Sequence, residues 1–290
     1  MEAHIQCAAP QRLDLPQLRS LKDEEMPLLY KYRSCSNEDE LGNVMRLLRG
    51  EFWFPLARDV NDPFEFRCAV DYGSLEDDIL RDTIKAFALV ECRMNPQISR
   101  EDAVKKVIGV FKKLKDDQIK RRQWELSFDL WRRFASEITM CCFSGTPTST
   151  LLWSHYAKGH TGVVIEVKPR GFVRCVTYPV KYTDEIAPFS PLALVDVRVA
   201  MRNKLFDVLF LRKASCWSYE EEYRILRKKS AAHAHTFKPG SVRRIILGCA
   251  MPDDMKEKIV AWVRENTPKV GIAIATPSSA RSYSLTIEKL

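Results

Sequence analysis

Residues 138–167 read ITMCCFSGTPTSTLLWSHYAKGHTGVVIEV, and this stretch decides the fold class. Apolar side chains alternate or run together over Ile138–Ser144 and again over Gly162–Val167, which is typical of strands. Between these strands, Thr150–Ala157 has the spacing of a short helix. The chain is therefore expected to mix strands and helices within one core.

The preceding part of the chain repeats this mixture. Leu28–Arg33 is predicted to be a strand, and Ser36 is placed to cap a helix that runs through Leu48 and ends at Gly50. Phe52–Leu56 resembles a second strand. A polar leader, residues 1–27, precedes these elements and is expected to be flexible.

The following part adds two helices and several strands. The helices are expected over Ala193–Leu211 and from Pro252 through Glu265. The strands are expected over Phe172–Tyr182, Tyr223–Arg227, Val242–Cys249, Val270–Ala275 and Ser282–Ile287.

A helical block interrupts this strand-bearing core. From residue 74 to 137 the apolar spacing is helical almost throughout. We therefore expect one α+β domain over residues 28–290, with a mixed, mostly antiparallel sheet and a helical insertion at about 74–137.

Composition limits the class of protein. The chain has 290 residues and a net charge of +8, and its nine cysteines include no CxxC pair. These features favour reduced thiols, a cytoplasmic location and no zinc ribbon. A secretory leader and a stretch long and apolar enough to span a bilayer are both absent from the sequence, so no membrane partner is expected.

Half of the net charge comes from Arg100–Glu137, where eleven basic residues accompany seven acidic ones. Such a block could attract a nucleic acid or an acidic protein surface. We favour a solvated helical face instead, because the signs are interspersed.

Two cations share one face of the first predicted strand. Lys31 and Arg33 are two residues apart, whereas Tyr30 and Tyr32 point to the other face. The pair either binds an anionic partner or lies on an exposed edge of the sheet.

The short helix of the opening stretch supplies a second candidate cluster. Trp153, His155 and Tyr156 place two aromatic rings beside an imidazole, a combination that could hold a planar ring or simply pack in a core. A nucleophile formed by Cys142 and His155 is a further alternative, although a cysteine in an apolar strand is more often inert.

The segment WSYEEEYR, residues 217–224, supplies a third candidate cluster. Glu222 and Arg224 share one face of a strand, and Glu222 either serves catalysis or forms an ion pair with Arg33 or Arg224. Asn61 and Asp62 form a turn before a proline, which backbone geometry alone explains.

The common nucleotide and hydrolase motifs are missing from the sequence. It contains no GxGxxG, Walker loop, HExxH or GxSxG. Spacing therefore identifies no metal site, and we expect none.

Six motifs in one order resemble a bacterial family that is catalogued only as a domain of unknown function and is often met in defence-associated gene neighbourhoods. The resemblance covers about residues 28–250. The motifs are LYKYR (29–33), NDPFE (61–65), CFS (142–144), WSHYAKGHTGVVIEV (153–167), YPVKYTDE (178–185) and WSYEEEYRI (217–225).

A more distant resemblance, to ADP-ribosyltransferase-like domains, suggests a reaction. It implies NAD as substrate, with Arg33 or Lys31 on the pyrophosphate or ribose, Trp153 and Tyr156 on the nicotinamide, and Glu222 as the late acid. This sequence has Lys31 where the family often has His.

We therefore expect an NAD-using glycosyl-transfer enzyme, either an ADP-ribosyltransferase-like protein or an NAD glycohydrolase, which could serve as a defence or toxin effector. Two alternatives remain: a non-enzymatic nucleotide-sensing or nucleic-acid-binding module, and a metal-dependent nuclease effector using Glu65 and Glu222. The predicted catalytic residues are Glu222, His155 and Tyr156. The predicted dinucleotide-binding residues are Lys31, Arg33, Asn61, Asp62, Trp153 and Arg224. The basic helices at 100–137 would contact a protein or nucleic-acid acceptor.

Overall fold

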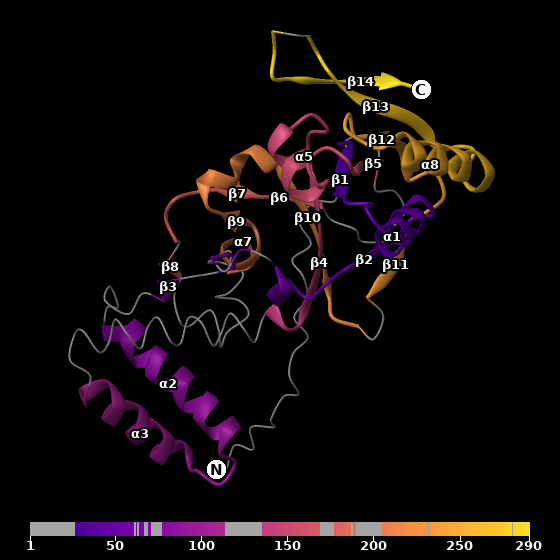
Figure 1. Ribbon diagram of the computed structural model, residues 1–290. Coiled ribbons are helices and arrows are strands. Elements are labelled where there is room, and N and C mark those ends of the chain that lie inside the picture. The colour runs from indigo at the N-terminus through magenta and orange to yellow at the C-terminus, as the bar shows by residue number, and fades with distance from the viewer. Residues whose placement is uncertain are drawn as a thin grey trace. The chain divides into compact units, whose positions relative to one another are not determined.

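A computed structural model describes residues 27–60, 62, 64–66, 69–70, 77–113, 135–168, 177–186, 188–189, 205–230, 233–279 and 281–290 (Figure 1). The chain divides into two compact units. The first comprises residues 1–17, 68–128 and 187–208, and the second comprises residues 18–67, 129–186 and 209–290.

An eight-stranded sheet forms the framework of the second unit, in the order β14-β13-β12-β5-β1-β4-β10-β6. Each neighbouring pair is antiparallel except β12 and β13, which are parallel. The strands are β1 (Leu29–Arg33), β4 (Ile138–Ser144), β5 (Val163–Val167), β6 (Thr177–Pro179), β10 (Glu222–Lys228), β12 (Val242–Leu247), β13 (Gly271–Pro277) and β14 (Leu285–Lys289). The expected α+β class with a mixed, mostly antiparallel sheet is confirmed.

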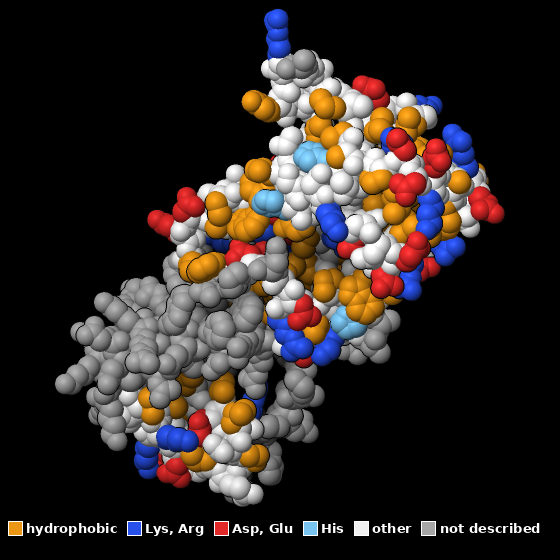
Figure 2. Space-filling view, viewed as in Figure 1, with side chains coloured by type: hydrophobic (Ala, Val, Ile, Leu, Met, Phe, Trp, Pro, Cys, Tyr) orange, Lys and Arg blue, Asp and Glu red, His pale blue; other side chains and the backbone are white. Residues whose placement is uncertain are grey.

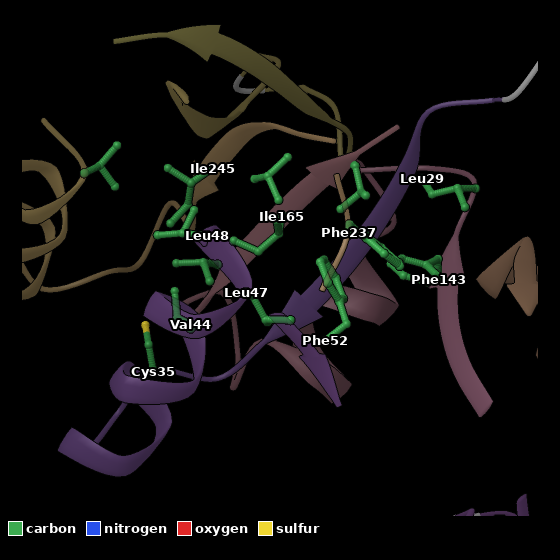
Figure 3. Close-up of a cluster of buried hydrophobic side chains, with 14 of the residues drawn as sticks. Leu29, Cys35, Val44, Leu47, Leu48, Phe52, Phe143, Ile165, Phe237 and Ile245 are labelled. Atoms are coloured by element: carbon green, nitrogen blue, oxygen red, sulfur yellow. The ribbon is translucent and has the colours of Figure 1, made fainter. Parts of the chain in front are cut away.

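One face of this sheet carries the larger hydrophobic core (Figure 3). Helices α1 (Glu38–Leu48) and α8 (Asp253–Asn266) pack their apolar side chains on it. The cluster includes Val44, Phe52 and Ile165, each 0% exposed. These side chains form the larger of the two cores described for the second unit.

The opposite face is covered by α5 (Thr150–Tyr156), the short helix of the opening stretch. Tyr30 and Tyr32 of β1 pack here against Leu152 and Trp153, whereas Lys31 lies against Phe143 of the first core. The predicted alternation of β1 is confirmed. Because β1 lies between β5 and β4, its cations do not occupy an edge strand.

Short elements complete the second unit. They are β2 (Glu51–Trp53) paired with β11 (Ala234–Thr236), β7 (Lys181–Tyr182) paired with β9 (Arg212–Lys213), and the 3-10 helices η1 (Ala57–Asp59) and η3 (Ser215–Glu220). The strand expected over Phe52–Leu56 is shorter and begins one residue earlier, at Glu51. Beyond it, Phe54 donates its N–H to the carbonyl of His233, and Leu56 forms an isolated bridge with Thr139.

The first unit contains α2 (Asp77–Met94) and α3 (Arg100–Lys113), which pack together and are joined by an ion pair between Lys106 and Glu91. Strands β3 (Ala69–Val70) and β8 (Pro188–Phe189) pair in parallel. The boundary between the units falls within α7 (Leu205–Phe210). The helix expected over Ala193–Leu211 ends at Phe210, one residue early. Its residues 193–204, and residues 114–134 of the basic block, lie outside the described residues.

The first helix begins one residue later than predicted. Asn37, not Ser36, is its N-cap and accepts a hydrogen bond from Glu40 N at 2.8 Å. Ser36 instead donates its N–H and its hydroxyl to the Glu40 carboxylate, each at 2.7 Å. The sequence placed the helix correctly and assigned the cap to the wrong residue.

Among the described helices, none is both long and apolar enough to cross a bilayer.

Candidate functional site

A cavity of about 270 Å³ opens in the second unit between β1, β4 and β10. Its lining combines tyrosines (Tyr30, Tyr32, Tyr156), cations (Lys31, Arg33, Lys213) and carboxylates (Asp59, Glu65, Glu220, Glu222). Segments far apart in the sequence therefore meet at one place.

The cavity exists because two neighbouring strands separate. In the described chain, β1 and β4 pair through a single register position, Tyr30 opposite Ser144, whereas β1 pairs with β5 along its full length. Further along β4, Met140 donates its N–H to Pro55 O at 2.9 Å instead of to β1. The split leaves backbone groups of β4 exposed to the cavity, where side chains can bind them.

Lys31 fills part of this split. Its ammonium donates to the carbonyl of Cys142 at 2.5 Å and lies 5.4 Å from the centre of the Phe143 ring. Burial lowers the pKa of Lys31 from its ordinary value. Lys31 is thus held at the cavity wall by a neutral acceptor.

Arg33 lines the same wall. Nη1 of the Arg33 guanidinium donates to Tyr32 O at 3.3 Å. Burial lowers the pKa of Arg33. Within the described part of the chain, neither Lys31 nor Arg33 forms an ion pair with a carboxylate. Both cations are therefore available to an anionic ligand.

A buried cluster of charges around Lys213 also lines the cavity. The Lys213 ammonium lies 3.0 Å from Glu65 Oε1, 2.6 Å from Glu220 Oε2 and 3.3 Å from Glu222 Oε2. Burial alone would lower the pKa of Lys213, but the three carboxylates outweigh it and raise the pKa. Lys213 is therefore a permanent cation that holds three acids together.

Arg224 supplies the second cation of the cluster and is 0% exposed. It donates to Glu222 through Nε (2.8 Å) and Nη2 (2.9 Å), to Glu65 through Nη2 (2.6 Å), and to Phe210 O through Nη1 (2.8 Å). The predicted shared face of Glu222 and Arg224 is confirmed. Arg224 and Lys213, rather than Arg33, form the ion pairs of Glu222 in the described chain.

The two carboxylates bound to Arg224 differ in pKa. Burial would raise the pKa of Glu222, but Arg224 and Lys213 lower it to about 2. Burial raises the pKa of Glu65. Glu222 is therefore the more firmly ionised acid of the pair.

Two tyrosines connect to the acids. Tyr156 donates its hydroxyl to Glu220 Oε1 at 2.9 Å, and Glu222 donates its N–H to the Tyr182 hydroxyl at 2.7 Å. Burial raises the pKa of Tyr182 to about 12, so it remains a neutral phenol near neutral pH.

The structure brings four of the predicted site residues to one cavity: Lys31, Arg33, Tyr156 and Glu222. Arg224 lies directly behind Glu222. Asp62 is 7% exposed and accepts from Phe64 N at 2.8 Å, as the turn interpretation requires. Asn61 lies outside the described residues.

Trp153 and His155 are placed differently from this group. Trp153 is 0% exposed, donates its indole N–H to Pro147 O at 2.8 Å and packs edge-on against Tyr32, so it belongs to the core beneath α5. His155 is exposed, with Nδ1 3.4 Å from the Tyr219 hydroxyl. Burial raises the pKa of the Cys142 thiol well above its ordinary value, which disfavours the thiolate that a Cys142–His155 nucleophile needs.

Two residues of the site were not anticipated. Glu220 stands beside Glu222 in the acidic segment EEE, and only its burial distinguishes it from exposed Glu221. Lys213 lies outside all six motifs, and its burial among three acids has no signature in the sequence.

The three carboxylates of the cavity converge on the ammonium of Lys213 rather than on a position that a metal ion could occupy. Glu65, Glu220 and Glu222 all bind Lys213, and the described residues contain no group of three or more His, Cys, Asp or Glu side chains able to hold a metal ion.

Comparison with known proteins finds no matching family model, no matching curated protein and no matching solved structure.

Proposed function

We propose that this protein cleaves the N-glycosidic bond of NAD and transfers the ADP-ribose to an acceptor or to water. One observation carries the proposal: a single cavity is lined both by two cations without carboxylate partners in the described chain, Lys31 and Arg33, and by Glu222, whose pKa is lowered. This arrangement suits a ligand that is anionic at one end and develops positive charge at the other.

The cationic wall suits the pyrophosphate. A guanidinium matches phosphate oxygens in pairs, so Arg33 would provide the main contact and Lys31 a second charge. The rings of Tyr30, Tyr32 and Tyr156 line the same space and supply apolar contact for a ribose or a planar base.

The acidic wall suits the reacting sugar. Cleavage between nicotinamide and ribose passes through an oxocarbenium-like centre, which a nearby carboxylate stabilises. Glu222 is ionised and lines the cavity. Glu220, bound to the Tyr156 hydroxyl, would accept a hydrogen bond from a ribose hydroxyl.

The test is release of nicotinamide from NAD by the full chain, with cell extract supplying acceptors. Wild type should turn over NAD, and Glu222→Gln should lose at least about a hundredfold in rate, as expected for loss of a charge that stabilises the transition state. Asp254→Asn, an exposed acid on α8, is the matched control and should keep full rate. No turnover by a folded wild-type protein would contradict the proposal.

A second candidate is a module that binds a nucleotide without turnover. It is favoured by one contact: both Glu222 oxygens already accept from Arg224. Saturable binding of ADP-ribose to wild type without nicotinamide release would support this alternative. Loss of that binding in Arg33→Gln would locate it in the cavity.

A further inference from the structure

A second concave surface lies in the second unit, and its lining includes no residue of β4 or β10. Three loops form it: the end of α1 at Arg49–Gly50, the turn between β11 and β12 at residues 236–240, and the link between α8 and β13 at residues 266–270. We call it the basic groove. Its volume is about 760 Å³.

The described lining of the basic groove carries charge of one sign. It contains Arg49, Lys238, Arg243 and Lys269 and no carboxylate. All four side chains are exposed. By contrast, basic and acidic side chains intermingle over α1 and α8 on the face shown in Figure 2. The uniform sign therefore distinguishes the groove from the neighbouring surface.

Hydrogen bonds hold the loops that form the groove. Phe237 donates its N–H to Gly50 O at 2.8 Å and so joins two of the loops, whereas within the third loop Val270 donates its N–H to Thr267 O at 2.9 Å. Arg49 is further held with its guanidinium 5.1 Å from the centre of the Trp262 ring. Four cations are thus displayed on a preformed concave frame, which lowers the ordering cost of binding.

We propose that the basic groove binds the phosphodiester backbone of duplex nucleic acid, independently of base sequence. Four like charges on a concave surface complement a convex polyanion. One aromatic residue, Phe237, is found among the described residues that line the groove. It is 2% exposed, and its ring stacks on that of Phe52 with 4.3 Å between the ring centres. Because that ring offers no free face, the groove lacks the base-stacking platform on which single-strand binding depends.

The experiment measures the salt dependence of binding of the full chain to a labelled duplex of roughly 20 base pairs. Each phosphate contact contributes about −0.9 to the slope of log K against log salt. Lys238→Gln with Arg243→Gln should therefore make the slope less steep by about 1.8 and weaken binding at low salt.

The matched control is Arg281→Gln with Lys289→Gln, which removes the same charge from exposed positions around β14. Its slope should equal that of wild type. Circular dichroism establishes that both double variants are folded. Binding unrelated to NAD turnover is expected, so failure of the catalytic proposal leaves this one standing.

Three results would overturn the proposal. The first is absence of duplex binding. The second is an unchanged slope of log K against log salt in the Lys238→Gln, Arg243→Gln variant, which would place the phosphate contacts elsewhere, for example on α3. The third is tighter binding to a single strand of equal length, or to vesicles rich in anionic lipid, than to the duplex.

Discussion

Arg224 and Glu222, two residues apart on β10, face each other through two parallel hydrogen bonds of 2.8 and 2.9 Å. Arg224 also binds Glu65, and Lys213 binds both acids, so three segments of the fold are joined at this point: β10, β9 and the turn at Glu65. The pair holds Glu222 in one orientation at the wall of the cavity. Its removal should therefore affect both stability and function.

Replacing Arg224 with Met should destabilise the protein by about 3–5 kcal/mol, because it leaves Glu222 and Glu65 buried without their main cation. The measurement is the free energy of unfolding in urea. Lys228→Met, on the exposed end of the same strand, is the control and should change it by less than about 0.5 kcal/mol. Equal effects of the two substitutions would show that the ion pair adds nothing.

Stability should fall as the pH drops from about 4.5 to about 2, where the Glu222 carboxylate takes up a proton. The folded state lowers the pKa of Glu222 to about 2, so its contribution is complete above the ordinary value of 4.5 and is lost below it. Glu65, with its raised pKa, acts in the opposite direction.

Unfolding in urea at several pH values between these limits measures this dependence. Glu222→Gln should be less stable than wild type near neutral pH and should lose less stability over the acid range. If the free energy of unfolding fell equally steeply with pH in both proteins between pH 4.5 and 2, the low pKa would not belong to Glu222.

Arg33→Gln should weaken ADP-ribose binding by about tenfold to a hundredfold, since a hydrogen bond to a charged group contributes about 1.5–3 kcal/mol. Calorimetric titration of the folded variant measures it. Arg46→Gln, exposed on the last turn of α1, is the matched control and should bind as wild type does. If Arg33 could be removed without cost, the ligand site would have to lie outside this cavity.

Gly248→Ala should destabilise the protein by about 1–3 kcal/mol or more, because its Cβ would collide with the backbone carbonyl of His160. The matched change Gly42→Ala lies in α1 with nothing within 4 Å of the new Cβ. It should stabilise the protein by about 0.5–1 kcal/mol. Thermal unfolding of the two variants should therefore shift in opposite directions.

The sequence predicted most regular elements because their apolar spacing is set by local geometry. Strand β4, helix α5 and helix α8 follow directly from such spacing. Strand β11 escaped prediction, since Ala234–Thr236 is too short to show a period and is held by pairing with β2. Pairing partners are fixed by tertiary contacts that no local pattern encodes.

The site was predicted in part for the same reason. Strand alternation placed Lys31 beside Arg33, and Glu222 beside Arg224. Helical spacing could not show that Trp153 faces the core while Tyr156 reaches the cavity. Lys213 could not be found, because its role depends on burial beside acids that lie far apart in the sequence, with Glu65 in one segment and Glu220 and Glu222 in another.

The hydrogen bond between Arg224 and Glu65 spans 159 positions of the chain. During synthesis on a ribosome, Glu65 emerges long before Lys213 and Arg224, the two cations that pair with it. The buried charge cluster can therefore be completed only after most of the polypeptide has been made, and a chain terminated before β10 would lack both Glu222 and Arg224.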